Sequence, residues 1–257
     1  MRAQTLPAAA GWRWLIDGFA IYRRNPPVMS ALVISYWLIV LFLNLLPVLG
    51  ALAASAIIPG LSVGLMQASR HLERGQPVTL SILFAAFREN ARTLLLLGAL
   101  YLLVTLGVLG LSALADGGAL LQYMLAGNRT ERAAVEDVDF TLSAALVAIL
   151  MVPVLMAWWF APVLAAWHRL TLGRSLFFSL VACTMNWRPF LVYSLGVLAI
   201  GVFVPGLLVG MLLVAVPGLQ EFAAVIVTMA MALLIAPTVF ASFYVGYRDI
   251  FGISELA

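Results

Sequence analysis

Six long apolar segments dominate the sequence and constrain its fold more than any other feature. They cover about 27–46, 51–69, 93–115, 140–167, 189–213 and 222–247. A helix needs roughly 20 mainly apolar residues to cross the hydrocarbon core of a bilayer. A chain inside lipid must satisfy its backbone hydrogen bonds internally, as continuous helices do. The segments therefore predict an all-α fold, a polytopic membrane bundle of six transmembrane helices.

The composition agrees with a membrane location. Hydrophobic residues make up 64% of the 257 residues and charged residues 10%, whereas a soluble domain is nearer half apolar and a quarter charged. The net charge of +3 comes from residues that flank the apolar segments, which favours a membrane surface over nucleic acid as the partner. Cys183 is the single cysteine, so an internal disulfide is excluded. We expect one membrane domain, 1–257, with no nucleic-acid partner.

A recurring junction precedes the odd-numbered spans. Between residues 12 and 22, apolar residues recur at helical spacing and charged residues lie on the other side, which is typical of a helix in the membrane interface. Asn25 and Pro26 follow, and an Asn N-cap with Pro in the first turn begins a helix. Asn90 and Asn186 stand in corresponding places and are also predicted N-caps. The sequence thus predicts three two-span repeats, each preceded by a cytoplasmic amphipathic helix. The repeats cover about 11–75, 76–171 and 172–257.

The second and third amphipathic helices are less regular than the first. Thr79 is expected to cap a short helix whose apolar side chains, between 80 and 87, share one face. The segment 172–185 is more apolar and is expected to lie deeper. The even spans carry Pro59, Pro153 with Pro162, and Pro237. Proline within a spanning helix is expected here as a kink that neighbouring helices tolerate, rather than as a ligand-binding break.

The charges predict the orientation of the six spans. Twelve Arg and five acidic residues lie on the side of the chain ends, a net charge of +7, against −4 on the other side. The acidic side includes the long connection at about 116–139. Because positively charged loops stay in the cytoplasm, both termini and all three amphipathic helices are predicted to be cytoplasmic, and the 116–139 loop periplasmic. Three parallel repeats further predict a pseudo-threefold axis along the membrane normal.

Arginines near the amphipathic helices are the candidate ligand-binding residues. They are Arg23, Arg24, Arg88, Arg92, Arg174 and Arg188. Guanidinium groups at the cytoplasmic surface can hold anionic lipid headgroups, although ordinary positive-inside signalling explains the same pattern. His71 and His168 leave the second and fourth spans at similar places, and they are expected to be polar helix ends rather than metal ligands.

No motif for catalysis is found in the sequence. It has no nucleophile elbow, Walker loop or metalloprotease helix, so no enzyme activity, cofactor or metal is predicted. No charged residue lies convincingly in the middle of a span, which argues against a proton-coupled carrier.

The junction motifs carry a family resemblance. Gly11-Trp12-x-Trp14-Leu15, Phe19-x-x-Tyr22-Arg23-Arg24-Asn25-Pro26, Ser62-Val63-Gly64-Leu65-Met66 and Phe84-x-x-Phe87-Arg88 resemble an uncharacterised family of bacterial inner-membrane proteins, found chiefly in beta-proteobacteria. The layout is also similar to the membrane domain of some glycerophosphodiester phosphodiesterases, without a catalytic domain. The resemblance implies a polytopic inner-membrane protein and carries no activity and no site residues.

Two functions follow from these features. The first is a non-enzymatic scaffold, accessory subunit or lipid-interacting protein, which binds anionic lipids and has room for a membrane-protein partner or a second copy. The alternative is a transporter or channel for a lipid or a small neutral solute along the pseudo-threefold axis.

Overall fold

A computed structural model describes residues 3–46, 49–118, 120, 138–215 and 220–252, and these contain helices but no strand. The helices are α1 (Ala10–Tyr22), α2 (Pro26–Asn44), α3 (Leu49–Glu73), α4 (Ala85–Asp116), α7 (Val138–Trp159), α8 (Ala161–Trp167), α9 (Leu172–Met185), α10 (Trp187–Leu198), α11 (Val204–Ala215) and α12 (Gln220–Phe251). A 3₁₀ segment, η1 (Leu80–Phe84), precedes α4, and a π-helical segment, η2 (Ala199–Phe203), joins α10 to α11.

Six helical segments of the described chain are long and apolar enough to cross a membrane, as the sequence predicted. They are Pro26–Asn44, Leu49–Glu73, Leu80–Leu114, Thr141–Trp167, Trp187–Met211 and Ala224–Phe251. Their outer faces carry large apolar side chains, with Leu114 86% exposed and Phe42 63% exposed. Apolar faces of this extent are abnormal in water and suited to lipid. The protein is therefore an all-helical integral membrane protein.

Two spans are interrupted where proline prevents a regular helix. Pro162 cannot donate to the carbonyl four residues earlier and its ring clashes with it, so the predicted fourth span divides into α7 and α8 at Phe160. Ser179 of α9 bridges this break, because it accepts from Phe160 N (2.9 Å) and donates to Met156 O (2.8 Å). In the fifth span, the widened π-helical turn η2 precedes Pro205 and absorbs the same conflict.

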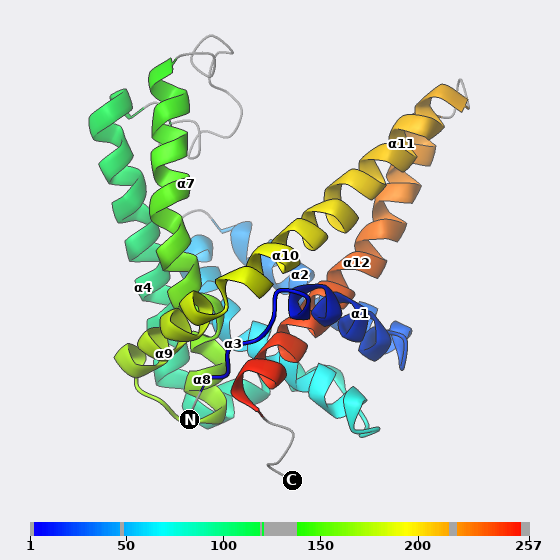
Figure 1. The fold of residues 1–257 in the computed structure, drawn as a ribbon, viewed down its shortest axis with the longest axis horizontal. Coiled ribbons are helices and arrows are strands. Elements are labelled where there is room, and N and C mark those ends of the chain that lie inside the picture. Colours follow the sequence, from blue (N-terminus) through cyan, green and yellow to red (C-terminus); the bar gives the residue numbers. More distant parts are fainter. Residues whose placement is uncertain (1–2, 47–48, 119, 121–137, 216–219, 253–257) are drawn as a thin grey trace.

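The spans form three hairpins, defined as α2–α3, α4–α7/α8 and α10/α11–α12. Helix α3 is central, because it packs against α2, α4, α8 and α12. In Figure 1 the second hairpin (green) and the third (yellow to orange) diverge towards the top of the view, while α8, α9 and the end of α12 lie at the lower end, and α1 lies higher, beside the third hairpin. We call this lower end the base of the bundle.

The segments that precede each hairpin do not pack mainly on the hairpin that follows them. Helix α1 packs against α12 and α10 of the third hairpin, η1 packs against α3 of the first, and α9 packs against α7 and α8 of the second. The contact at Gly11 is close, since a Cβ there would lie 2.0 Å from Pro189 O. The second of these segments differs from the prediction. It is a five-residue 3₁₀ helix, and Thr79 bonds Ser81 (2.9 Å) instead of capping it.

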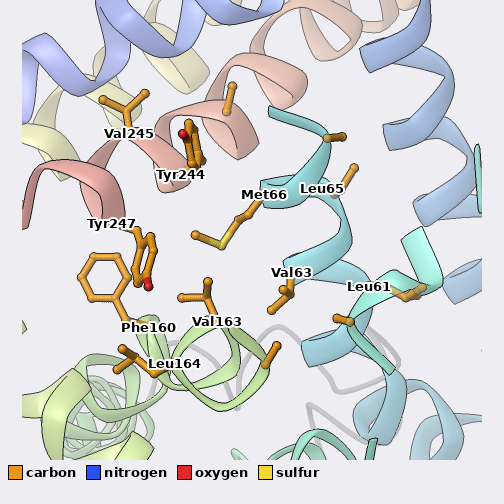
Figure 2. Close-up of a cluster of buried hydrophobic side chains, with 14 of the residues drawn as sticks. Leu61, Val63, Leu65, Met66, Phe160, Val163, Leu164, Tyr244, Val245 and Tyr247 are labelled. Atoms are coloured by element: carbon orange, nitrogen blue, oxygen red, sulfur yellow. The ribbon is translucent and has the colours of Figure 1, made fainter. Parts of the chain in front are cut away.

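The base holds a group of buried apolar side chains from three helices. In Figure 2, Val63 and Met66 of α3 face Val163 of α8 and Tyr247 of α12, and Phe160 and Leu164 lie beside them. Leu61 and Leu65 are on the opposite side of α3, and Tyr244 and Val245 belong to the same turn of α12. All of these side chains are buried. One helix from each hairpin thus contributes to a single apolar plug at the base.

Both ends of the described chain lie at the base. Gln4 N donates to Ile250 O (2.8 Å), and Leu6 N donates to Asn186 Oδ1 (2.9 Å). The segment before α1 is therefore fixed between the end of α12 and the start of α10.

Candidate functional site

A polar cluster lies beside the apolar plug, where α3, α8 and α12 end. Glu73 of α3 accepts a hydrogen bond from the Tyr244 hydroxyl (2.5 Å) and pairs with Arg248, both of α12. Nearby, His168 Nε2 and the Tyr247 hydroxyl lie 2.6 Å apart and share a hydrogen bond. We call these five residues the base cluster. They connect the last turns of the three even spans.

The ion pair in the base cluster is only partly accessible. The side chain of Arg248 is 26% exposed and that of Glu73 24%. Arg248 also contacts Asp249 (2.9 Å) and Asp17 of α1 (3.5 Å). Because charges in such surroundings are costly to leave unpaired, the cluster holds α1, α3 and α12 in one arrangement.

Arg24 reinforces the same junction. Its guanidinium Nη1 donates to Leu72 O (3.2 Å) and to Glu73 O. The last carbonyls of a helix have no partner within the helix and form the negative end of its dipole. A cation placed there satisfies both needs. Arg24 therefore ties the start of the first hairpin to the end of α3, a structural contact that the sequence did not reveal.

Burial and the positive charge of Arg70 hold the pKa of His168 below its ordinary value of about 6.5. The other predicted histidine, His71, lies 3.4 Å from Pro77 O by its Nδ1. The two histidines have different partners, and no group of three or more His, Cys, Asp or Glu is found within the described ranges.

The other five predicted arginines are spread over the ends of α1, α4, α9 and α10. Arg23 lies over the Phe19 ring, 5.1 Å from its centroid, and Arg188 over the Trp187 ring at 5.4 Å. Arg88, Arg92 and Arg174 complete the set. None of the five pairs with an acidic side chain in the part of the chain that the structure describes. Their charges are therefore free of internal neutralisation there.

The three predicted N-cap asparagines behave differently. Asn25 is the N-cap of α2, and its side chain accepts from Val28 N (3.4 Å). Asn90 has nearly the same backbone angles, φ −157° and ψ 61° against −155° and 77°, but its amide donates to Ala165 O (3.0 Å) and Leu170 O (3.4 Å).

Asn186 occupies the N-cap position of α10, but its side chain makes no cap hydrogen bond. Its amide accepts from Leu6 N and donates to Gln4 O and Ala182 O, each at 2.9 Å. The side chain is buried, and two of its three hydrogen bonds go to the segment before α1, which lies far away in the sequence and could not be foreseen.

A cavity of about 510 Å³ lies above the plug, between α3 on one side and α4 and α7 on the other. Its lining is mainly apolar and aromatic, with the neutral polar side chains of Asn44, Ser55, Ser62 and Thr105. Among the described residues, no charged side chain lines it. The cavity ends at Phe160 and Val163, which belong to the plug.

Sequence reasoning missed the base cluster. Glu73 and Arg248 were visible only as charges that mark the ends of the second and sixth spans. Two such charges of opposite sign on the same side of the membrane are a usable signal, because antiparallel hairpins bring the ends of even spans together. Nothing in the sequence pairs them uniquely.

Comparison with known proteins identifies the family. The chain is 36% identical over 261 residues to a probable inner membrane protein of Burkholderia thailandensis, covering 99% of this chain and 96% of that protein. No protein-family model and no solved structure matches. Identity of this level over nearly the whole length, together with six apolar helices, places the protein in the inner membrane as a multi-pass protein of unknown activity. The chain belongs to the same family as this Burkholderia inner membrane protein.

Proposed function

We propose that the protein is a non-enzymatic, lipid-interacting scaffold, one membrane domain built from three repeats. Its base faces the cytoplasm and gathers anionic lipids. The observation that carries the proposal is the set of base arginines without acidic partners in the described chain, on helices whose exposed faces are apolar. Cations above apolar surface match a leaflet of anionic lipids.

The cyclic packing supports the threefold repeat. We call α1, η1 and α9, which precede the three hairpins, the leading segments. Segment η1 packs on the first hairpin and α9 on the second, in each case the hairpin before it in the chain. Helix α1 packs on the third hairpin and so closes the ring. The contacts all fall on the even spans: Gly18 meets Thr238, Leu83 meets Gly64, and Ser179 meets Phe160. Three junctions of this kind are what a pseudo-threefold axis requires.

The charge distribution supports cytoplasmic termini. The side of the chain ends carries a net charge of +7 and the opposite side −4, as the positive-inside rule requires of a cytoplasmic base. Most of the acidic connection at 116–139 lies outside the described residues. A fluorescent protein fused after the last residue should fluoresce, and alkaline phosphatase inserted in that connection should be active. The opposite pattern of reporter activity would reverse the orientation.

Lipid binding is tested by native mass spectrometry on protein in nanodiscs of mixed phosphatidylglycerol and phosphatidylethanolamine. We expect phosphatidylglycerol to be enriched in the lipid that leaves with the protein. Joint replacement of Arg88, Arg92 and Arg174 by Gln should lower the enrichment. Equal retention of both lipids by the wild-type protein would refute the proposal.

The second candidate is a transporter for a lipid or small neutral solute. The cavity of about 510 Å³ favours it, because its uncharged lining suits a neutral molecule. The cavity ends at Phe160 and Val163 of the apolar plug, so transport through the base needs the three even spans to separate there. Proteoliposomes distinguish the two functions. Transfer of a fluorescent neutral lipid between leaflets, faster than in vesicles with the heat-denatured protein, would favour the transporter.

A further inference from the structure

A second cavity, of about 290 Å³, lies under helix α1. Trp12, Ile16 and Phe19 of α1 form one wall, together with Leu15. The opposite wall comes from the third hairpin, by residues between 197 and 200 and between 234 and 239. Apart from Thr238 all lining residues are apolar, and the Thr238 hydroxyl donates to Leu234 O (2.8 Å). The cavity thus offers no polar group of its own to a ligand.

A cation stands at one end of this cavity. Residues 12, 16, 19 and 23 follow one face of α1 because their spacing matches the helical repeat. Arg23 ends this face, and its guanidinium lies 5.1 Å from the centroid of the Phe19 ring, which is itself part of the cavity wall. Arg23 is exposed and has no acidic partner in the described ranges. An apolar cavity and an unpaired cation therefore adjoin on one surface.

The surroundings of the cavity favour lipid over a peptide as the occupant. Trp12 is 46% exposed and Ile16 53% exposed, and they lie beside membrane-spanning helices, so this face of α1 meets the bilayer. The π-helical segment Ala199–Phe203 includes Ile200 in the cavity wall. Such widened turns are rare and frequently occur at functional sites. The wall of the third hairpin is thus irregular where the cavity lies.

We propose that this cavity binds one acyl chain of an anionic phospholipid, with the headgroup phosphate on Arg23. The chain inserts between α1 and the third hairpin, and the guanidinium donates to the phosphate oxygens while it remains stacked on Phe19. This site rests on the proposed function and gives it a location. The retained lipid lies between α1 and the third hairpin and contacts both.

The experiment combines a cavity-filling variant with a matched control. Ile200→Trp fills the cavity, whereas Leu198→Trp places the same ring on an exposed position of the same segment. In nanodiscs of phosphatidylglycerol and phosphatidylethanolamine, Ile200→Trp should reduce tightly retained phosphatidylglycerol by at least about tenfold, and Leu198→Trp should leave it unchanged. Arg23→Gln should keep one retained lipid but lose the preference for phosphatidylglycerol.

A second measurement needs no variant. Phosphatidylglycerol with a photoactivatable group in its acyl chain should cross-link to peptides that contain 197–200 or 234–239 in the wild-type protein. Labelling elsewhere only, or equal retention by the two Trp variants, would overturn the site. If anionic lipid stays enriched in that case, the proposed function survives without the site; if the wild type shows no enrichment, the proposed function itself fails.

Discussion

Removal of the Glu73 carboxylate is the sharpest test of how the base is held together. In the structure this carboxylate pairs with Arg248 and accepts a hydrogen bond from the Tyr244 hydroxyl (2.5 Å). In Glu73→Ala both partners lose it. Arg248 keeps Asp249 at 2.9 Å, so its charge is not left alone, but Tyr244 has no other hydrogen-bond partner for its hydroxyl in the described chain.

The expected loss of stability can be estimated from these contacts. A hydrogen bond to a charged group contributes about 1.5–3 kcal/mol. Two such bonds are removed and Arg248 is partly compensated by Asp249, so Glu73→Ala should lower the free energy of unfolding by about 2–4 kcal/mol. For a chain of this size this corresponds to a decrease in Tm of roughly 5–15 °C.

Thermal unfolding in detergent, followed by intrinsic tryptophan fluorescence, measures this decrease. The control is Glu89→Ala, which breaks the pair with Arg169 (2.9 Å), whose side chains are 74% and 48% exposed for Arg169 and Glu89. An exposed pair contributes at most about 1 kcal/mol. Tyr244→Phe, made in the wild type and in Glu73→Ala, should lower Tm less in Glu73→Ala, because the two residues share one hydrogen bond. If Glu73→Ala lowers Tm no more than Glu89→Ala does, the base cluster does not hold the hairpins.

Two further predictions concern the helix packing and the pH dependence. Gly98→Ala should lower Tm by several degrees, because the new Cβ would lie 2.0 Å from Ser55 O and overpacking costs about 1–3 kcal/mol. The control, Gly107→Ala, has no atom within 4 Å of its Cβ and should leave Tm unchanged or raise it. Equal effects of the two variants on Tm would disprove the close contact of α3 and α4. The pKa of His168 in the folded protein is lowered by burial and by Arg70. As the pH falls, the unfolded state therefore binds a proton at this histidine before the folded state does. The contribution of His168 to the free energy of unfolding is complete above about pH 6.5 and is lost as the pH falls towards the lower pKa of the folded state. Thermal scans should show a steeper decrease in Tm below pH 6.5 for the wild type than for His168→Gln, and parallel profiles would contradict a lowered pKa of His168 in the folded protein.

The spans were predictable from sequence because hydrophobic length is a local property. The start of the first span follows from Asn25 and the prolines beside it, and the observed helix, Pro26–Asn44, begins within one residue of the predicted 27–46 and ends two residues earlier. The break at Phe160 was missed because it depends on Ser179 of another repeat to satisfy the backbone.

The contacts of the base were beyond local reasoning. Asn186 has the sequence context of an N-cap, yet a segment about 180 residues away takes its amide. The orientation in the membrane, the threefold repeat and the lipid partners stay predictions, as does the likeness to glycerophosphodiester phosphodiesterases.

The cyclic packing of the leading segments is tested most directly by a disulfide between α1 and the third hairpin. A Cβ at Gly18 would lie 2.8 Å from Ser242 Cβ, so a small shift brings the two to the separation of about 3.8 Å that a disulfide needs. In a Cys183→Ala background, Gly18→Cys with Ser242→Cys should form an intramolecular disulfide in native membranes on mild oxidation, and neither single variant should. Absence of this bond in a protein that is correctly inserted and as stable as its parent would contradict the packing of α1 on the third hairpin, and with it the cyclic packing.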